Sequence, residues 1–352
     1  MDKKSEHIYT GLKIKKMNKA YRKAIRKSSI SKSVIPNENN DWWIYEKVIK
    51  FFIRIILLIS TPRAVWQNKS KTDELIDRTY SKFNAKDSVF VSISLAFYFL
   101  ISFVPILTIV VFLMNLLPET FSKTFINEIM HRIIPGAENV LSLNFKTGFS
   151  KSANYTAIAF LLITSTWIGS SGWGRFIYLQ NYVYKHESLG NFFLNRLRGF
   201  FIVIGISLYI FIMALFYVSF FNYINPKIST NTGKNIFFYI SFDIYLFIFL
   251  YIGFILIYKL TPSFKNPLTS VLPGVLITTL PNLVFISVFG HLISNGNYYK
   301  NYGIVGAFIY LALFVSSLSY FIFLGIIINE AYYKTYYSSY TTAKRNFWII
   351  KV

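Results

Sequence analysis

The sequence predicts an all-α fold: a polytopic membrane protein, with a bundle of six transmembrane helices plus interfacial amphipathic helices. The first observation is the composition, because 54% of the 352 residues are hydrophobic and only 15% are charged, whereas soluble proteins have about 25% charged residues. The second is the stretch from Tyr302 to Ile328, where tyrosine hydroxyls are the only ionisable groups. About 20 apolar helical residues cross a bilayer core of about 30 Å. Lipid makes such a crossing helical, because the backbone must satisfy its own hydrogen bonds.

The chain is expected to divide into four regions. These are a basic cytosolic tail (1–41), an interfacial helix with a cytosolic linker (42–87), the six-helix membrane domain (88–333) and a cytosolic C-terminal tail (334–352). The first 35 residues contain eleven lysines and arginines, which predicts attraction to anionic lipids of about 1 kcal/mol per basic residue near the surface. The alternative is a tail whose charge only fixes the topology. No aromatic-basic recognition module surrounds the charges, so we expect no specific nucleic-acid partner.

Residues 42–60 predict a helix that lies in the membrane surface. The segment begins with two tryptophans, and Lys47, Lys50 and Arg54 fall on one helical stripe. A basic face opposite a large apolar face, with interfacial tryptophans, is typical of helices that lie on a bilayer rather than cross it. Residues 63–87 are polar and predict a further helix and a linker leading to the first span.

Five other stretches with at most one charged residue precede the segment at 302–328, which gives six spans in all. They lie at 89–117, 153–174, 199–222, 236–258 and 268–294. The links between them are short except for 118–152, which predicts an amphipathic segment along the surface.

The distribution of basic residues predicts the orientation, because cytosolic loops carry an excess of lysine and arginine. With six spans, 30 of the 37 lysines and arginines fall on the face that holds both termini. Counting residues 42–60 as a seventh span erases this bias. Six spans with both termini in the cytosol is therefore the preferred topology.

Several motifs follow one another in a recognisable order. They are Ser94–Pro105 in the first span, Ser170–Asn181 at the end of the second, Asn195–Arg198 before the third, Leu272-Pro-Gly274 in the fifth, Tyr299–Gly303 before the sixth, and Gly325 with Asn329-Glu330 at its end. Together they resemble the YihY/BrkB family of virulence factor BrkB-like inner-membrane proteins, over roughly residues 45–333. The departures are the long basic tail and the pair Pro281-Asn282 in the fifth span, where we expect an uninterrupted apolar helix.

The resemblance implies a virulence factor-like protein of the bacterial plasma (inner) membrane, with no settled activity. Parts of the family were formerly labelled as ribonuclease BN, a label that this sequence does not support. Metal-dependent phosphodiester cleavage needs clustered carboxylates or histidines, but the four histidines are scattered and the chain has no cysteine. Neither a phosphate-binding P-loop nor a Gly-x-Ser-x-Gly elbow is present. We expect no enzyme activity, no bound metal and no cofactor.

Polar residues inside the spans are the candidate substrate-pathway residues, because ionisable groups there are costly and usually face protein or water. Asp243 lies about 12 Å from the outer end of the fourth span, and is interpreted as a proton or cation site or, alternatively, as a hydrogen-bonded group that locks two helices. Asn282 follows a proline that should kink the fifth span, and His291 lies near the outer end of the same helix. Ser170 and Ser171 belong to a Ser/Thr/Gly run in the second span, which predicts close helix packing or, alternatively, a polar groove wall.

Arg175 ends the second span and Glu330 ends the sixth, both on the cytosolic side. They are candidates for an ion pair that closes the inner face, with snorkelling to lipid headgroups as the alternative for each.

Two hypotheses for the function remain. The first is a transporter or flippase for a lipid-linked or amphipathic substrate, with a cavity lined by the second, fourth and fifth spans. The second is a non-transporting membrane scaffold that recruits partners through its basic tail. The expected partners are the lipid bilayer, anionic lipids in particular, and a second copy of the chain or other membrane proteins.

Overall fold

The computed structural model describes residues 43–85, 88–130, 133, 155–228, 230–295 and 303–344. The basic tail predicted for 1–41 lies outside these residues, as does most of the connection from 131 to 154. The chain divides into two units, residues 1–52 and 53–352, which are described separately.

In the first unit, the described residues form the beginning of helix α3 (Trp43–Ser60), which continues into the second unit. Lys50 pairs with Glu46 one turn earlier, with 2.7 Å between Nζ and Oε1. The helix predicted for 42–60 is therefore present, and its position in the membrane surface stays a prediction.

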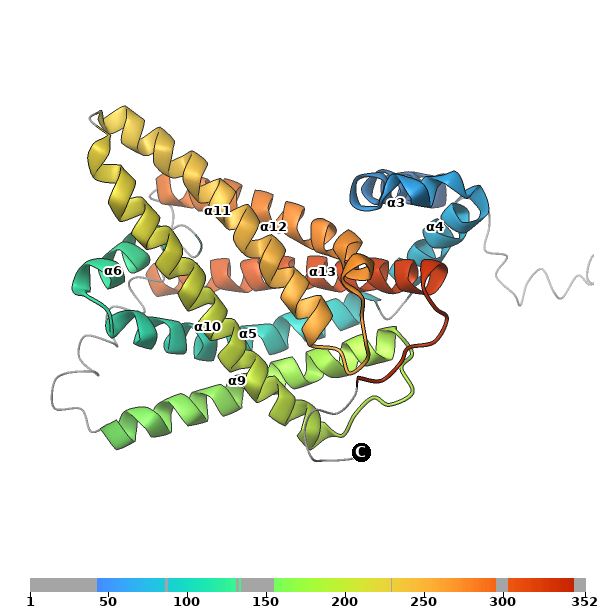
Figure 1. Cartoon of the computed structure of the whole chain (residues 1–352), viewed down its shortest axis with the longest axis horizontal. Helices are drawn as coiled ribbons and strands as arrows, with labels where there is room; N and C mark the ends of the chain where they lie inside the picture. Colours follow the sequence, from blue (N-terminus) through green and yellow to red (C-terminus); the bar gives the residue numbers. More distant parts are fainter. Residues whose placement is uncertain are drawn as a thin grey trace, which may run out of the picture. The chain divides into compact units, whose positions relative to one another are not determined.

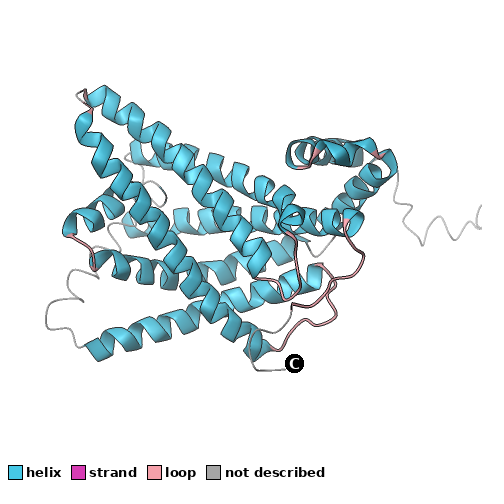
Figure 2. Cartoon of the chain, viewed as in Figure 1, coloured by secondary structure: helices cyan, strands magenta, loops and turns pink. Residues whose placement is uncertain are grey.

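The second unit is helical throughout its described residues, apart from connecting loops and one isolated β-bridge between Phe264 and Ala343 (Figure 2). After α3 come the 3₁₀ turn η2 (Arg63–Gln67), α4 (Lys69–Phe83), α5 (Ser88–Asn115), α6 (Glu119–Thr124), the π-helical turn η3 (Phe125–Met130), α9 (Tyr155–Val183), α10 (Phe192–Ile224), η4 (Asn225–Lys227), α11 (Asn231–Leu260), α12 (Leu268–Asn295) and α13 (Gly303–Tyr336). The all-α prediction is confirmed.

Six long helices, α5 and α9 to α13, correspond to the six predicted spans. Five of them are long and apolar enough, by length and composition, to cross a membrane: α5, α10, α11, α12 and α13. The described residues of α9 do not reach that apolarity, because serines, threonines, glycines and Arg175 interrupt them. α9 nevertheless packs along both α5 and α10, so it belongs to the bundle.

The packing order of the long helices is a ring with one weak side. α10 packs on α9, α9 on α5, α5 on α13, α13 on α12 and α12 on α11. α10 and α11 are consecutive in the sequence, but their backbones come close together at few positions. Figure 1 shows the two helices diverging from the turn that joins them. The backbones of neighbouring helices in this ring therefore approach closely except between α10 and α11, which meet mainly through long side chains.

Small residues allow the tight contacts, as predicted for the second span. A Cβ on Gly172 of α9 would overlap the Ser102 hydroxyl of α5, and a Cβ on Gly274 of α12 would overlap the Gly325 carbonyl of α13. Such close backbone approach is typical of helices that associate in lipid.

The segment after α5 is more deeply packed than the predicted surface connection. Phe125, Ile129 and Met130 of η3 are buried to 3% exposure or less and contribute to the hydrophobic core. The amphipathic character predicted for 118–152 is present in this part, because Glu119 and Lys123 are exposed, but its apolar side chains belong to the hydrophobic core rather than lying along the surface. The rest of that connection lies outside the described residues.

Candidate functional site

An apolar cavity of about 470 Å³ lies on the weak side of the ring, where α10 and α11 diverge. These two helices, with Thr261 at the end of α11, supply more than half of the lining residues. α5, η3 and α13 supply most of the others. Trp173 of α9 and Ile286 of α12 each contribute one side chain. The predicted cavity between the second, fourth and fifth spans is thus corrected: its walls are mainly the first, third, fourth and sixth long helices.

Aromatic rings hold α10 and α11 together near the turn that joins them. Phe221 and Phe238 have ring centroids 5.2 Å apart, and further from the turn Tyr217 and Tyr245 stack at 4.5 Å. Still further along, the Tyr209 hydroxyl donates to the Phe249 carbonyl at 2.6 Å. These contacts therefore hold the two helices together from the turn as far as Tyr209 and Phe249.

The rim of the cavity lies beyond these contacts, near the start of α10 and the end of α11. Phe201 is 58% exposed and Leu260 is 62% exposed, although both line the cavity. Gly205 also lines it, and a Cβ built there would meet no atom within 4 Å. The cavity therefore opens sideways, through a gap between two transmembrane helices.

The polar atoms of the lining are few and largely engaged. The Ser102 hydroxyl donates to the Gly169 carbonyl at 2.7 Å, and the Thr261 hydroxyl donates to Gln180 Oε1 at 2.6 Å. Trp173 is not engaged, because its buried indole N–H has no hydrogen-bond partner among the described residues. The cavity thus suits a hydrocarbon chain, and the Trp173 N–H is a spare donor for an acceptor group on the ligand.

A buried ion pair lies at the end of the bundle where α9, α11 and α13 end. Lys82 Nζ of α4 is 2.6 Å from Glu330 Oε2 of α13, and it also donates to the Val183 carbonyl of α9 at 2.9 Å. The Glu330 side chain is only 2% exposed. Burial lowers the pKa of Lys82, and the neighbouring Glu330 carboxylate opposes part of this change. The pair joins α4 to two helices of the bundle.

Beside this pair, α11, α12 and α13 are joined by buried hydrogen bonds. The Gly274 N–H donates to Asn329 Oδ1 at 2.7 Å. The Tyr258 hydroxyl lies 2.6 Å from the Thr278 hydroxyl and donates to the Ile322 carbonyl at 2.9 Å. This end of the bundle is therefore specified by polar contacts as well as by apolar packing.

The predicted pathway residues do not meet at one place. Asp243 lies on the exposed face of α11 and accepts a hydrogen bond from the Ser287 hydroxyl of α12 at 2.8 Å. Asn282 is fully buried in α12, where its amide donates to the Thr278 carbonyl at 2.7 Å, while its Oδ1 has no hydrogen-bond partner among the described residues. The Ser170 and Ser171 hydroxyls donate to carbonyls three residues earlier in α9.

None of these four residues lines the cavity. His291 lies in α12, but its side chain is outside the described part of the structure. The proline before Asn282 does not end the helix, because α12 runs unbroken from Leu268 to Asn295.

The predicted pair of Arg175 with Glu330 is also corrected. Glu330 pairs with Lys82, and the Arg175 guanidinium lies over the rings of Tyr98 and Phe192, 5.8 and 5.4 Å from their centroids. Arg175 is exposed, whereas Glu330 is enclosed by helices. The sequence placed both at helix ends but gave no information on which partner each would meet.

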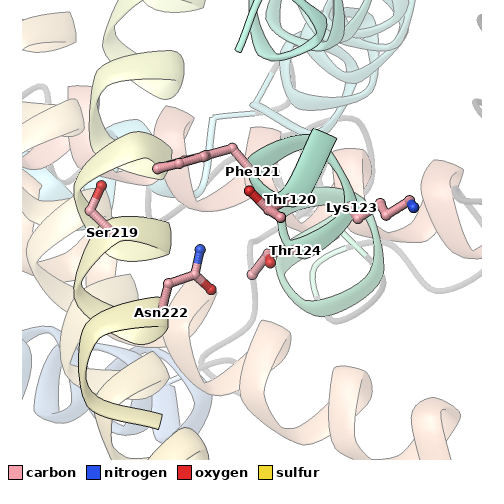
Figure 3. Close-up of a pocket in the computed structure, with 6 residues that line it drawn as sticks. All are labelled: Thr120, Phe121, Lys123, Thr124, Ser219 and Asn222. Carbon is pink, nitrogen blue, oxygen red and sulfur yellow. The ribbon is translucent and has the colours of Figure 1, made fainter. Parts of the chain in front are cut away.

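An open depression of about 700 Å³ lies between α6 and the end of α10 (Figure 3). In Figure 3, Asn222 extends from α10 toward α6, Phe121 reaches from α6 toward α10, and Lys123 points away. Lys123 pairs with Glu119 at 2.8 Å, and both side chains are exposed. The ammonium of Lys123 is thus already paired with a carboxylate.

The comparison with known families agrees with the architecture. The model of the family described as Virulence factor BrkB matches residues 79–347, which include all six long helices. This chain belongs to the BrkB family. A relative from Bacillus subtilis (strain 168), named as a ribonuclease-like protein, YfkH, is 24% identical over 267 residues, which cover 72% of this chain and 94% of the relative. No solved structure matches the chain.

The family assignment shows that this BrkB-family chain is a multi-pass membrane protein, as its apolar helices indicate. Sequence reasoning placed the cavity between other helices and missed the role of Lys82. A usable signal for the cavity was the pair Gly205 and Gly253, one on each diverging helix. Lys82 gave no such signal, because it is one of many lysines in a polar segment.

Proposed function

We propose that this BrkB-family protein moves a lipid-like amphiphile across the bilayer, with the apolar chain of the substrate in the cavity between α10 and α11. The observation that carries this proposal is an apolar cavity whose exposed rim lies between two membrane-crossing helices. A substrate that enters from the bilayer needs such a sideways opening, whereas a small water-soluble solute needs a polar path. The unpartnered Trp173 N–H supports a substrate with an acceptor, such as an ester carbonyl, next to its chain.

Reconstitution into liposomes tests this function directly. Liposomes with a trace of headgroup-labelled fluorescent lipid are exposed to a membrane-impermeant reducing agent, which bleaches only the outer leaflet. With the protein, the bleached fraction should exceed the value for protein-free liposomes. A bleached fraction equal to that of protein-free liposomes would favour the non-transporting scaffold.

Gly205→Trp is the informative variant, because the new side chain projects into open space rather than into a neighbour. It should reduce lipid movement strongly without unfolding the protein. Two controls match it: Gly205→Ala leaves the cavity open, and Ile212→Trp adds the same ring at a 49% exposed position of α10 that does not line the cavity. Equal activity of all three variants would contradict the proposed path.

We further propose that the end of the bundle holding the Lys82–Glu330 pair faces the cytosol in the bacterial plasma membrane. The excess of lysine and arginine on this face supports the assignment. The chain has no cysteine, so single cysteines can be introduced without a background. A cysteine at position 340 should resist an impermeant thiol reagent in intact cells, and one at position 227 should react; the reverse pattern would invert the topology.

We also propose that the protein is not a ribonuclease, despite the name of its Bacillus relative. Within the described residues, no group of three or more His, Cys, Asp or Glu side chains is placed to hold a metal ion. Purified protein should leave labelled RNA intact under conditions in which it moves lipid, and cleavage that co-purifies with the folded protein would contradict this.

A further inference from the structure

The described C-terminal segment is fastened to the rim of the cavity. The Lys265 N–H donates to the Thr342 carbonyl at 2.8 Å, and the Lys344 N–H donates to the Ser263 carbonyl at 3.0 Å. Phe264 and Ala343 form the isolated β-bridge between these two bonds. The segment is thereby held against the loop between α11 and α12.

This attachment fixes the Lys344 ammonium at the end of α11. Its Nζ donates to three carbonyls, those of Lys259 (3.1 Å), Leu260 (2.9 Å) and Pro262 (2.8 Å). A cation here complements the free carbonyls at a helix C-terminus. Leu260 is a residue of the cavity rim, so the ammonium lies directly beside the opening.

Two more cations lie close to Lys344. Arg198, near the start of α10, donates from its guanidinium to the Ser263 hydroxyl at 2.8 Å, and Lys259 lies in the last turn of α11. The pKa of Lys344 is lowered to about 8, first by burial and then by the charges of Arg198 and Lys259. We call Arg198, Lys259 and Lys344 the basic cluster.

The basic cluster has no acidic counterpart among the described residues, because none of its members lies within ion-pair distance of a carboxylate there. Three like charges held together repel one another, and this repulsion is relieved when an anion binds between them. Lys344 uses its three donors on carbonyls. The guanidinium of Arg198 and the ammonium of Lys259 therefore remain to contact a ligand, and a guanidinium matches two phosphate oxygens at once.

The geometry points to a binding site for the phosphate ester of an anionic lipid, held by Arg198 and Lys259 in the field of Lys344 while the lipid chain occupies the adjacent cavity. Residues on either side of the two contact residues support this arrangement. Phe201 follows Arg198 by one turn, and Leu256 and Leu260 flank Lys259, and all three line the cavity. This headgroup site rests on the proposed function, which places the apolar chain of the lipid in the cavity. It adds a selectivity: lipids with a net negative headgroup should bind more tightly than lipids whose phosphate is neutralised by choline.

Binding of two lipids that differ only in headgroup tests this selectivity. The full-length protein in a neutral detergent is titrated with phosphatidylglycerol and with phosphatidylcholine that carry the same fluorescent chain. We expect phosphatidylglycerol to bind roughly tenfold more tightly, which is the scale of one or two charge-assisted contacts. Arg198→Gln combined with Lys259→Gln should remove most of this preference, because it should weaken phosphatidylglycerol binding far more than phosphatidylcholine binding.

Matched variants separate the basic cluster from charge in general. Lys227→Gln combined with Lys265→Gln removes two charges outside the cluster and should keep the preference. Arg198→Lys combined with Lys259→Arg retains the two charges and should keep most of the preference. This variant also shows whether substitution at the two positions simply unfolds the protein. Retention of the full preference in the Arg198→Gln, Lys259→Gln variant would overturn the headgroup site.

Two further binding experiments show whether the cavity proposal or the headgroup site is wrong. If Gly205→Trp weakens binding of both lipids while the double glutamine variant keeps the preference, the cavity proposal stands and the headgroup site is wrong. If Gly205→Trp binds both lipids like the unmodified protein, the cavity proposal itself fails. Glycerol 1-phosphate, a soluble phosphate ester, should not displace phosphatidylglycerol at equal concentration. Displacement would assign the cluster to a soluble phosphate compound and overturn the lipid assignment.

Discussion

Replacing Lys82 by methionine should destabilise the protein far more than removing an ordinary surface lysine. The change keeps most of the side-chain volume but leaves the Glu330 carboxylate, 2% exposed, without its cation at 2.6 Å. Loss of one partner of a buried ion pair typically costs about 3–5 kcal/mol, because the remaining charge is uncompensated. The bond from Lys82 to the Val183 carbonyl is lost as well, so α4 loses one polar contact with α9 and one with α13.

The complementary variant should be less harmful. Glu330→Gln leaves Lys82 with the Val183 carbonyl and a side chain that is 25% exposed, so its cost should be about 1–2 kcal/mol. Combining Lys82→Met with Glu330→Gln should recover much of the loss from Lys82→Met alone, since no buried charge then remains.

Thermal unfolding in detergent, followed by the loss of the monodisperse peak on size-exclusion chromatography, ranks these variants. Lys123→Met is the matched control, because Lys123 also pairs with a glutamate, at 2.8 Å, but both side chains are exposed. That pair should contribute at most about 0.5 kcal/mol. Equal melting temperatures for Lys82→Met and Lys123→Met would refute the reasoning about the buried pair.

Three other predictions follow from the same contacts. Gly274→Ala should lower the melting temperature by the equivalent of about 1–3 kcal/mol, because the added Cβ meets the Gly325 carbonyl and lies 2.5 Å from the Asn329 side chain. Gly205→Ala, with open space at its Cβ, should show no such loss, and equal melting would contradict the packing argument. Asp243→Asn should keep lipid movement and its pH dependence, because the amide oxygen can still accept the Ser287 hydrogen bond and Asp243 does not line the cavity. Loss of movement in this variant would instead place the carboxylate in the pathway. Finally, the preference for phosphatidylglycerol should fall by about twofold between pH 7 and pH 9, because Lys344, whose pKa is lowered to about 8, loses its positive charge in that window. The nearby His186 has a pKa lowered by burial and is already neutral there, so a constant preference in binding titrations would contradict the role of Lys344.

The helices could be predicted from the sequence because the bilayer sets their length and excludes charge. Their ends could not, because the prediction used charged residues to mark the ends of the second and sixth spans. α9 continues past Arg175 to Val183, and α13 continues past Glu330 to Tyr336. A helix needs an apolar surface only where it meets lipid; beyond that depth its backbone bonds tolerate charged side chains, which then find partners on other helices.

The candidate site was largely beyond the reach of the sequence, because it depends on how far apart two helices pack. Apart from Gly205 and Gly253, nothing local in α10 or α11 predicts that they diverge; this follows from the partners that each finds elsewhere in the bundle. For the same reason the partner of Glu330 proved to be Lys82, in a polar helix that gave no sign of being half-buried. The one polar residue singled out at depth in the fourth span, Asp243, lies on the outward face instead.

The central claim is that a lipid chain occupies the space between α10 and α11. Photocrosslinking tests it most directly: a phospholipid with a diazirine near the end of one chain is added to the protein in liposomes, irradiated, and the modified residues are mapped by mass spectrometry. We expect labels on cavity residues such as Gly205, Tyr209 and Gly253, with less labelling in Gly205→Trp. Labels confined to outward residues of the same helices, such as Ile212 and Ile248, and unchanged in that variant, would contradict it.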